Sequence, residues 1–278
     1  MSEAKAPTSS TAQVTTVVLT LNEAEHLPDC LVSVREMGPI LVLDSGSSDA
    51  TVTIARAAGA RVVARPFINY SIQRQAALDL VQTPWVFFVD ADERVPSALA
   101  SAVAQAASRG DADAPVAYWI ARRNLFWGHA LRGGGWWPDH QLRLLRVDHA
   151  HYDPSRAVHE LAEIAGATGR IDSPLEHLNY ASWAEFRAKQ RAYARLEADR
   201  RRSAGQRPRP HNLLLQPLRE FWRRFVTHHG YRDGILGLRL ALAMAWTELV
   251  TLWWVRRGES QVLFVLLVLL IAANRTAS

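Results

Sequence analysis

Four apolar runs alternate with helix-like segments in the first part of the chain, and this alternation limits the possible fold more than any other feature. The runs are rich in valine, isoleucine, leucine and aromatic residues, which is typical of buried strands; they cover residues 14–21, 40–43, 60–65 and 85–89. Segments of helical character follow them, at residues 22–36, 50–58, 71–81 and 96–107. Strands that alternate with helices form right-handed βαβ units. The sequence therefore predicts an α/β fold with a mostly parallel sheet flanked by helices.

The ends of the predicted helices carry recognisable signals. Asn22 can cap the first helix, with Glu25 three residues later as its capping-box partner. Pro96 suits the first turn of the last helix.

Polar clusters follow three of the four strands, at the sheet edge where ligands of such folds bind. The clusters are Asn22–Glu23, residues 44–49 and residues 90–93. Neither GxGxxG nor GxxxxGK[ST] is present, so no glycine loop after the first strand cradles phosphates. A divalent cation, Mn²⁺ or Mg²⁺, held by Asp90 and Asp92 would supply the positive charge that a diphosphate needs. The competing interpretation is that these aspartates cap the following helix and that Glu93 is a solvated acid of its first turn.

Composition restricts the setting of the protein. The chain has 278 residues, 49% of them hydrophobic, and a formal net charge of +5. The one cysteine, Cys30, cannot form a disulfide within the chain, which fits a reducing compartment. Residues 1–13 are small and polar, and we expect a disordered lead without a secretory signal. No nucleic-acid-binding motif is present.

Several stretches resemble family 2 glycosyltransferases. The nucleotide-sugar motifs of that family are similar to LTLNEAEHLPDCL, LVLDSGSSDAT and WVFFVDADE, in this order. Further segments are similar to the lipopolysaccharide-core glucosyltransferase subgroup: NLFWGHALRGGGWWPDHQLRLLR, AVHE and YRDGILG. The resemblance covers roughly residues 14–240. It implies a GT-A fold, a DxD-type metal site and transfer with inversion of the anomeric centre.

The resemblance also implies roles for individual residues. The nucleotide-sugar would contact Leu21, Asn22, Glu23, Asp44, Arg74, Asp90 and Ala91; the metal would bind Asp92 and His159; the acceptor would contact Trp136 and Trp137. Asp139 is the first candidate for the general base and Glu160 the competing one. Many family members have two adjacent aspartates where this chain has Asp44-Ser45, which weakens the expectation that Asp44 recognises uracil.

Each of these roles has a plainer alternative. Asp139 follows Pro138 and could be a turn residue, His159 could be structural, and tryptophans are commonly core residues. Gln73, Arg74 and Arg143 could reach the diphosphate or could lie on solvated faces. The glycines before Trp136 suggest a mobile loop.

The last third of the chain has a different character. We expect a catalytic domain over residues 14–200, a basic linker over 201–212 and membrane-associated helices over 213–278. Leu214, Leu218, Phe221, Trp222 and Phe225 share one helical face of a basic segment, which suits an anionic membrane surface or packing on the catalytic domain. The apolar runs 240–255 and 260–274 are short for a single span, since about 20 residues cross a bilayer. They favour a peripheral or shallowly embedded position at the cytoplasmic face of a bacterial inner membrane.

The leading hypothesis is an inverting, metal-dependent glycosyltransferase that moves a sugar from a nucleotide-sugar, UDP-linked and of the UDP-glucose type, to a lipid-anchored oligosaccharide such as the lipopolysaccharide inner core. An alternative acceptor is a polyprenyl phosphate or a capsule intermediate. A different class is a non-catalytic, membrane-associated protein that binds nucleotide-sugars. A nucleotidyltransferase is disfavoured because the segment after the first strand is acidic and lacks glycine. The sequence leaves the oligomeric state open.

Overall fold

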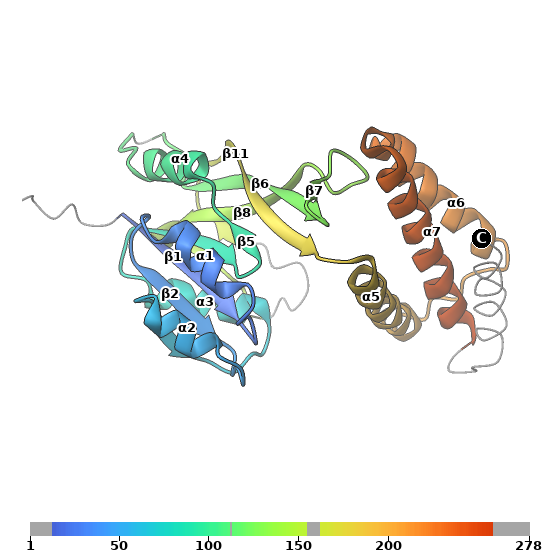
Figure 1. The fold of residues 1–278 in the computed structure, drawn as a ribbon, viewed down its shortest axis with the longest axis horizontal. Helices are drawn as coiled ribbons and strands as arrows, with labels where there is room; N and C mark the ends of the chain where they lie inside the picture. The colour runs from blue at the N-terminus through green and yellow to red at the C-terminus, as the bar shows by residue number, and fades with distance from the viewer. Residues whose placement is uncertain (1–12, 112, 155–161, 258–278) are drawn as a thin grey trace, which may run out of the picture. The chain divides into compact units, whose positions relative to one another are not determined.

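The computed structural model describes residues 13–111, 113–154 and 162–257. Contacts divide the chain into two compact units (Figure 1). The N-terminal unit comprises residues 1–131 and 136–179, and the C-terminal unit comprises residues 132–135 and 180–278. The short segment 132–135 therefore belongs to a different unit from the residues on either side of it.

The four predicted strands form a parallel sheet in the N-terminal unit. They are β1 (Val14–Thr20), β2 (Ile40–Asp44), β3 (Arg61–Ala64) and β4 (Trp85–Asp90). Their order is β3-β2-β1-β4, and each neighbouring pair runs parallel. Burial on both faces of the sheet explains the mostly apolar composition of β1, β2 and β4, whereas β3 lies at the edge and is partly exposed.

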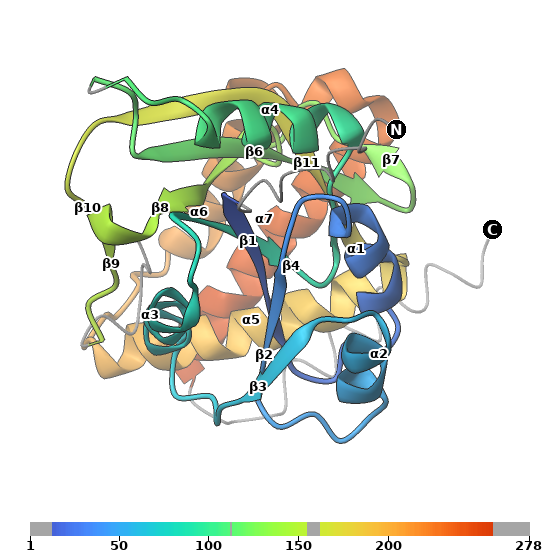
Figure 2. The same ribbon diagram turned by 90° about the vertical axis from the view of Figure 1, so that its left-hand side faces the viewer.

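Helices cover both faces of this sheet. They are α1 (Leu27–Val34), α2 (Thr51–Ala57), α3 (Tyr70–Leu80) and α4 (Ser97–Ala107). The core that contains Val18 and Phe87 packs against α1, α2 and α4, whereas the core that contains Val17 and Phe88 packs against α3. Figure 2 shows α3 on one side of the central strands and α1 and α2 on the other. Alternate residues of one strand thus serve two cores.

The sheet continues beyond β4 with antiparallel strands. The order is β4-β8-β6-β11-β5, formed by β8 (Asp139–Arg146), β6 (Ala117–Phe126), β11 (Thr168–Tyr180) and β5 (Glu93–Arg94), with β7 (His129–Ala130) paired to β6. A 3₁₀ turn (Val147–His149) and a small sheet of β9 (Ala150–His151) and β10 (Glu163–Ile164) lie beside it. This antiparallel half brings residues distant in sequence towards the end of β4.

The predicted capping box at Asn22 was wrong. Helix α1 begins at Leu27, five residues later than Asn22, and Asn22 has a positive φ of 56°. Its side chain joins two loops instead: Oδ1 accepts a hydrogen bond from the backbone N–H of Ser48 at 2.8 Å. Asparagine tolerates the left-handed region and bonds locally, so the same residue type that caps helices also suits this turn. Pro96 occupies the N-cap position of α4 rather than its first turn.

The C-terminal unit is helical. Its helices are α5 (Trp183–Ser203), α6 (Asn212–Trp222) with a π-helical continuation (Arg223–Thr227), a 3₁₀ turn (Gly230–Asp233) and α7 (Gly234–Arg257). Helix α7 packs against both α5 and α6, and Figure 1 shows α6 and α7 side by side. Because α5 runs to Ser203, the first residues of the predicted linker are helical, and α5 is grouped with the C-terminal unit.

The glycine-rich segment 132–135 is held in place by the C-terminal unit rather than being a free loop. The Asp233 carboxylate accepts hydrogen bonds from the backbone N–H of Arg132 at 2.8 Å and of Gly133 at 3.0 Å. Arg224 donates to the carbonyl of Gly134 at 2.9 Å. A Cβ on Gly133 would lie 2.3 Å from the carbonyl oxygen of His229, closer than any real contact. Gly133 is needed for close backbone approach, and Gly134 and Gly135 adopt positive φ values of 68° and 80° that favour glycine.

Candidate active site

The loop after β2 is organised by a buried carboxylate. Asp44 is 2% exposed and lies at the end of β2, opposite Thr20 of β1. Its Oδ1 accepts hydrogen bonds from the hydroxyls of Thr20 at 2.9 Å and Ser47 at 2.5 Å, and its Oδ2 from the backbone N–H of Gly46 and Ser47. Burial alone would raise the pKa of Asp44, but these bonds hold it below its ordinary value. Both oxygens of the Asp44 carboxylate are therefore already hydrogen-bonded within this loop region, whereas the sequence suggested that Asp44 contacts uracil.

The ends of β1 and β2 are joined by further hydrogen bonds. The backbone N–H of Asn22 donates to the Ser47 hydroxyl, and that of Glu23 donates to the Thr51 hydroxyl, each at 2.8 Å. Leu21 is 51% exposed beside them. Three residues expected to contact the nucleotide-sugar, Leu21, Asn22 and Glu23, therefore lie on a pair of hydrogen-bonded loops at the carboxyl edge of the sheet.

A buried arginine balances two carboxylates at the end of β4. Arg143 of β8 donates through one terminal nitrogen to Asp90 Oδ2 at 2.7 Å and to Glu93 Oε1 at 2.5 Å. Burial alone would raise the pKa of Asp90, but Arg143 holds it well below the ordinary value. The other side-chain nitrogens of Arg143 are buried without a hydrogen-bond partner in the described chain. Arg143 therefore maintains the acidic turn, and contact with a diphosphate would have to use those remaining nitrogens.

Glu93 is fully buried, which excludes the solvated helix-turn acid considered from the sequence. Its Oε2 accepts a hydrogen bond from the backbone N–H of Asp90 at 2.8 Å, and β5, which contains it, pairs with β11. Burial raises the pKa of Glu93 to about 8, against the attraction of Arg143 and with added repulsion from Asp90. Of the three acids in this turn, Glu93 is the structural one.

Asp92 faces His177 of β11, and this pairing was not foreseen. His177 Nε2 lies 3.2 Å from Asp92 Oδ2, while its Nδ1 lies 2.7 Å from Asn124 Oδ1. Asn124 also receives a hydrogen bond from Asn179 on Oδ1 and donates to the carbonyl of Trp136, so its amide orientation is fixed. Since Asn124 offers an acceptor to Nδ1, that nitrogen carries a proton. In the neutral ring, Nε2 then presents its lone pair towards the Asp92 carboxylate.

This donor set fits a divalent cation in chemical type. A carboxylate oxygen and an imidazole nitrogen that face one another are both ligands of Mn²⁺, and a ligating histidine commonly donates its other ring N–H to a fixed acceptor. Asp92 keeps a third of its side chain exposed, which leaves access for a ligand. Among the described residues no three histidine, cysteine, aspartate or glutamate side chains are grouped to hold a metal.

Asp139, the first candidate for the base, lies at the start of β8 in an ion pair. Its Oδ2 is 2.6 Å from Arg122 Nη2, and its Oδ1 accepts from Gln141 at 2.8 Å. Burial alone would raise the pKa of Asp139, but Arg122 outweighs it and lowers that pKa. Arg122 also lies 3.8 Å from Glu93, so Asp139 belongs to the same charge network as the β4 turn. The lowered pKa makes the Asp139 carboxylate a weaker base than a free aspartate.

The remaining predicted residues separate into contact positions and framework. Ala91 is buried in the core, so only its backbone can meet a ligand. Gln73 donates to the Ser45 hydroxyl and the Arg65 carbonyl, both at 3.0 Å, and so supports the loop instead of reaching a diphosphate. Arg74 of α3 lies 5.7 Å from the centre of the Phe88 ring and helps to lower the pKa of Asp90.

The two tryptophans expected at the acceptor are both half-buried. Trp136 packs edge-on against Phe126 at 4.9 Å, and Trp137 lies under the Arg123 guanidinium at 6.0 Å. Phe126 and Arg123, both of β6, hold the two tryptophans against the sheet, and part of each ring remains exposed to solvent. His159 and Glu160 lie outside the described residues.

The antiparallel strands supply the site residues that the sequence analysis missed: Arg122, Asn124 and His177. Each occurs at a strand position of β6 or β11, without a local motif. The available signal was a histidine in the otherwise alternating stretch TGRIDSPLEHLNY, which is weak because a lone histidine is usually structural. Only the pairing of distant strands reveals their neighbourhood.

Comparison with known proteins agrees with this architecture. The model of glycosyl transferase family 2 matches residues 15–169. The lipopolysaccharide core biosynthesis glycosyltransferase LpsC of Rhizobium meliloti (strain 1021) is 30% identical over 234 residues, 82% of this chain and 86% of that protein. An uncharacterised glycosyltransferase of Rickettsia bellii (strain RML369-C) is 31% identical over 40% of this chain and 38% of that protein.

Similarity to a solved structure extends over nearly the whole chain. The structure of the mannosyltransferase PcManGT of Pyrobaculum calidifontis was solved with GDP-mannose and Mn²⁺. The match includes 89% of this chain and 88% of the PcManGT chain, with a TM-score of 0.50 and 13% sequence identity. At this identity the likeness concerns the fold, which is of the GT-A type. From the matched family model, the long match to LpsC and this architecture, we conclude that the chain belongs to glycosyl transferase family 2, in the LpsC-like subgroup, and is a glycosyltransferase.

Proposed function

We propose that this protein is an inverting, metal-dependent glycosyltransferase that moves a sugar from a nucleotide-sugar to a lipid-anchored oligosaccharide, with the lipopolysaccharide inner core as the acceptor class. The observation that carries the proposal is the pair formed by Asp92 and His177 at the carboxyl end of β4. A carboxylate and an imidazole nitrogen face each other there, beside Asp90 and next to the loops of β1 and β2. The length of the match to LpsC supports the acceptor class.

Asp92 and His177 would hold the cation, Mn²⁺ or Mg²⁺, in place of the Asp92–His159 pair expected from the sequence. The bound cation would act as a Lewis acid that neutralises charge on the leaving diphosphate. Asp90 is kept ionised by Arg143, so its carboxylate remains available as a hydrogen-bond acceptor for the ribose or donor sugar. The network around Arg143 thus fixes the acidic turn before a ligand arrives, which favours binding without reorganisation.

Two carboxylates remain candidates for the general base. Asp139 lies in the network of the acidic turn, and its ion pair with Arg122 positions it while reducing its basicity. Glu160 is the competing residue. If Asp139 is the base, approach of the acceptor hydroxyl must loosen the Arg122 pair, which would raise the pKa of Asp139 towards its ordinary value.

We propose UDP as the nucleotide, with UDP-glucose as the first donor to test. The four hydrogen bonds that Asp44 already accepts mean that uracil would be read by other groups on the β1 and β2 loops, with Asp44 holding those loops in shape. PcManGT carries GDP-mannose on the same type of fold, so a guanine-linked donor is the natural comparison.

We further propose that the protein acts at the cytoplasmic face of the inner membrane and that α7 does not cross it. Taken together, the 3₁₀ turn and α7 form one described helical stretch, Gly230–Arg256, that is long and apolar enough to span a bilayer. However, Glu248 within it forms an ion pair with Arg201 at 2.8 Å, and Trp254 lies under the Arg195 guanidinium at 5.3 Å. Both arginines belong to α5, a strongly charged helix that could not enter hydrocarbon with α7. These contacts favour a packed helix at the membrane surface.

The test is a thermal-shift screen of UDP-, GDP- and other nucleotide-sugars, each with and without Mn²⁺, followed by a transfer assay with a lipid-linked core acceptor. A ligand that binds the native state raises the melting temperature. We expect a UDP-sugar shift that requires the metal and that is lost in Asp92→Asn and in His177→Ala. Asp172→Asn, an exposed acid on the same strand as His177, is the matched control and should behave as the wild type.

The outcomes separate the alternatives. Full transfer activity in Asp92→Asn would refute the metal assignment. Equal shifts from GDP- and UDP-sugars would refute the preference for UDP. Transfer to a polyprenyl phosphate but not to core oligosaccharide would change the acceptor class. Binding without transfer or hydrolysis, with either metal and every acceptor, would favour the non-catalytic binding protein.

A further inference from the structure

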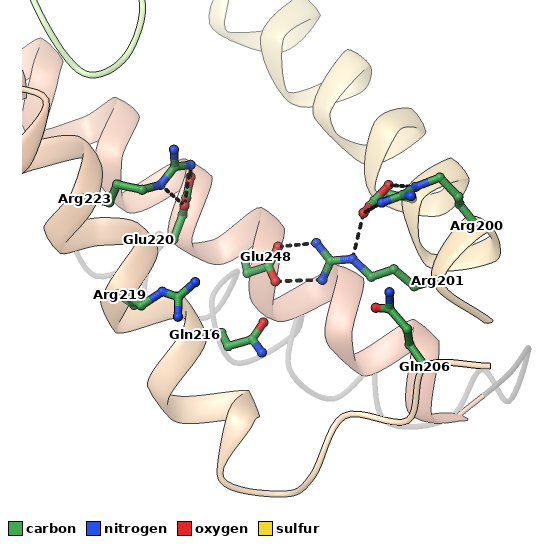
Figure 3. Close-up of a pocket in the computed structure, with 9 residues that line it drawn as sticks. Arg200, Arg201, Gln206, Gln216, Arg219, Glu220, Arg223 and Glu248 are labelled. Carbon is green, nitrogen blue, oxygen red and sulfur yellow. Dashed lines mark hydrogen bonds and ion pairs between the residues drawn. The ribbon is translucent and has the colours of Figure 1, made fainter. Parts of the chain in front are cut away.

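A polar cavity of about 600 Å³ lies within the C-terminal unit, remote in sequence from the acidic turn of β4. The end of α5, the following connection, α6 and α7 all contribute to its wall (Figure 3). Four arginines line it, Arg200, Arg201, Arg219 and Arg223, together with three glutamates and two glutamines. A cavity of this size and composition is large enough for a phosphate-containing group.

The glutamates of this cavity are already neutralised. Glu197 pairs with Arg200 and Arg201, each at 2.7 Å. Glu248 pairs with Arg201 at 2.8 Å. Both carboxylates that α5 and α7 contribute to the cavity wall are therefore paired with arginines and do not repel a bound anion strongly.

The third glutamate is paired twice, and one arginine is left over. Glu220 binds Arg223 at 2.7 Å and Arg224 at 2.6 Å. The Arg219 guanidinium makes no hydrogen bond or ion pair with any residue in the described ranges, and Figure 3 shows it drawn towards Gln216 without a bond. Five guanidinium groups thus meet three carboxylates, which leaves a local excess of positive charge around Arg219.

The amide groups of the cavity add hydrogen-bond donors. Gln216 of α6 and Gln206 of the connection line it, and neither side chain is bonded to another described residue (Figure 3). An unpaired guanidinium beside two free amides is the chemistry that binds a phosphate monoester or diester, since both offer N–H donors to anionic oxygens.

An exposed apolar row runs along α6 next to the cavity wall. Leu214, Leu218 and Trp222 are spaced four residues apart and are 66%, 56% and 62% exposed. Arg219 of α6 and Arg223, the first residue of its π-helical continuation, follow Leu218 and Trp222 directly in sequence and therefore lie beside that row. A helix with leucine and tryptophan on one face and arginine beside them suits the boundary between acyl chains and phosphate headgroups.

We propose that this cavity binds the phosphate group of an anionic membrane lipid. The Leu214–Leu218–Trp222 row would then enter the boundary between headgroups and acyl chains of the same leaflet. A soluble phosphate would use the arginines but would leave the apolar row without a partner, which is why the combination points to a lipid surface. The inference rests on the proposed function only in placing the acceptor in a membrane. It assigns a lipid site to the C-terminal unit, separate in its residues from the donor site.

The experiment measures partition of the full chain between buffer and vesicles, made of phosphatidylcholine alone or mixed with phosphatidylglycerol. Arg219→Gln removes the unpaired guanidinium without breaking an ion pair. An arginine at an anionic surface contributes about 1 kcal/mol, so we expect partition to the mixed vesicles to fall about fivefold. Arg191→Gln, an exposed arginine of α5 outside the cavity, makes the same charge change and should lower partition less than twofold. Leu218→Ser should weaken binding to both vesicle types.

Several results would overturn the proposal. Equal losses in Arg219→Gln and Arg191→Gln would mean diffuse attraction without a site. Equal binding of the wild type to both vesicle types would mean apolar adhesion alone. A thermal shift of the wild type by inorganic phosphate that Arg219→Gln abolishes, with vesicle partition unchanged in that variant, would assign the cavity to a soluble anion.

The same measurement separates this proposal from the proposed function. Asp92→Asn should lose sugar transfer and retain wild-type partition to mixed vesicles. Arg219→Gln should keep the metal-dependent shift with the nucleotide-sugar. Loss of vesicle binding by Asp92→Asn would contradict a lipid site built from the C-terminal unit alone.

Discussion

Glu93 illustrates how a single residue can have opposite meanings in sequence and in structure. It follows Asp92 in a run of acids, yet it is fully buried between Arg143 and the backbone N–H of Asp90. A buried charge needs compensation, and Arg143 serves Glu93 and Asp90 together. Because burial raises the pKa of Glu93 whereas Arg143 holds the pKa of Asp90 low, the proton of this pair belongs on Glu93.

The raised pKa of Glu93 predicts a pH-dependent stability. Folding moves this pKa from 4.5 to about 8, because burial outweighs the pull of Arg143, so the native protein keeps a proton that the unfolded chain releases. The contribution is fully present below the unfolded value and is lost as pH rises through the folded one. As pH rises from 4.5 to about 8, the free energy of unfolding should decrease, by at most about 1.4 kcal/mol per pH unit.

Glu93→Gln tests this expectation, because its amide cannot titrate. Urea unfolding, measured with a chelator present at a series of pH values, should show the wild type losing stability relative to the variant as pH rises through that window. Parallel curves for the two proteins would show that Glu93 is ionised throughout.

Local sequence was informative about some site residues and silent about others. Asp90 and Asp92 were predictable because they lie at and just after the end of a buried strand, and that end is fixed by the strand's own composition. Asp44 was located correctly, but its role depends on donors from Thr20 and Ser47 that only the loop geometry brings together. His177 lies 85 residues from Asp92, and no spacing rule links them.

At the scale of elements, the parallel half of the sheet could be predicted and the antiparallel half could not. Strands β1, β2 and β4 are mostly apolar because both of their faces are covered, and β3 is a short edge strand. The expected bounds of all four agree closely with the structure. Strands β6 and β11 instead mix exposed and buried positions, and β11 contains Pro174 and several charged residues. Tertiary contacts decide how these strands pair, and these contacts outweigh the intrinsic strand propensity of the residues.

The 3₁₀ turn before α7 lies very close to the first turn of α7, and this predicts that a side chain at Gly237 would destabilise the protein. A Cβ on Gly237 would lie 1.9 Å from the carbonyl oxygen of Gly230, which is backbone and cannot swing aside. We expect Gly237→Ala to lower the free energy of unfolding by about 1–3 kcal/mol or more, as overpacking does. Chemical denaturation monitored by tryptophan fluorescence would measure the loss.

Gly110→Ala is the matched control for this substitution, because nothing lies within 4 Å of a Cβ at Gly110. Its stability should remain within about 0.5 kcal/mol of the wild type. If the two variants were equally stable, the backbone of residues 230–237 would have to relax at little cost.

At the scale of the whole molecule, the chain passes between its two units at three places: residues 131–132, 135–136 and 179–180. The C-terminal unit therefore consists of two separated pieces of sequence. Asp233 joins them through the backbone N–H groups of Arg132 and Gly133.

Asp233→Asn should loosen this junction. The amide loses the charge that strengthens both hydrogen bonds and keeps one oxygen as an acceptor, so we expect a loss of about 1 kcal/mol in local stability. Hydrogen exchange of a peptide that contains residues 132–135 should become several-fold faster.

Asp199→Asn is the control for the junction. It removes an exposed carboxylate of the same unit, which pairs with Arg202, and should leave exchange of that peptide unchanged. If Asp233→Asn also left it unchanged, other contacts such as that of Arg224 with Gly134 would be sufficient to hold the segment.

The Asp233 junction has a consequence for how the chain emerges from the ribosome. The backbone N–H of Gly133 and its acceptor are separated by 100 residues of sequence. At synthesis rates of about 5–20 residues per second, the glycine segment waits roughly 5–20 s before Asp233 exists. During that interval the backbone N–H groups of Arg132 and Gly133 lack this acceptor, and a chain that stops before Asp233 would never acquire it.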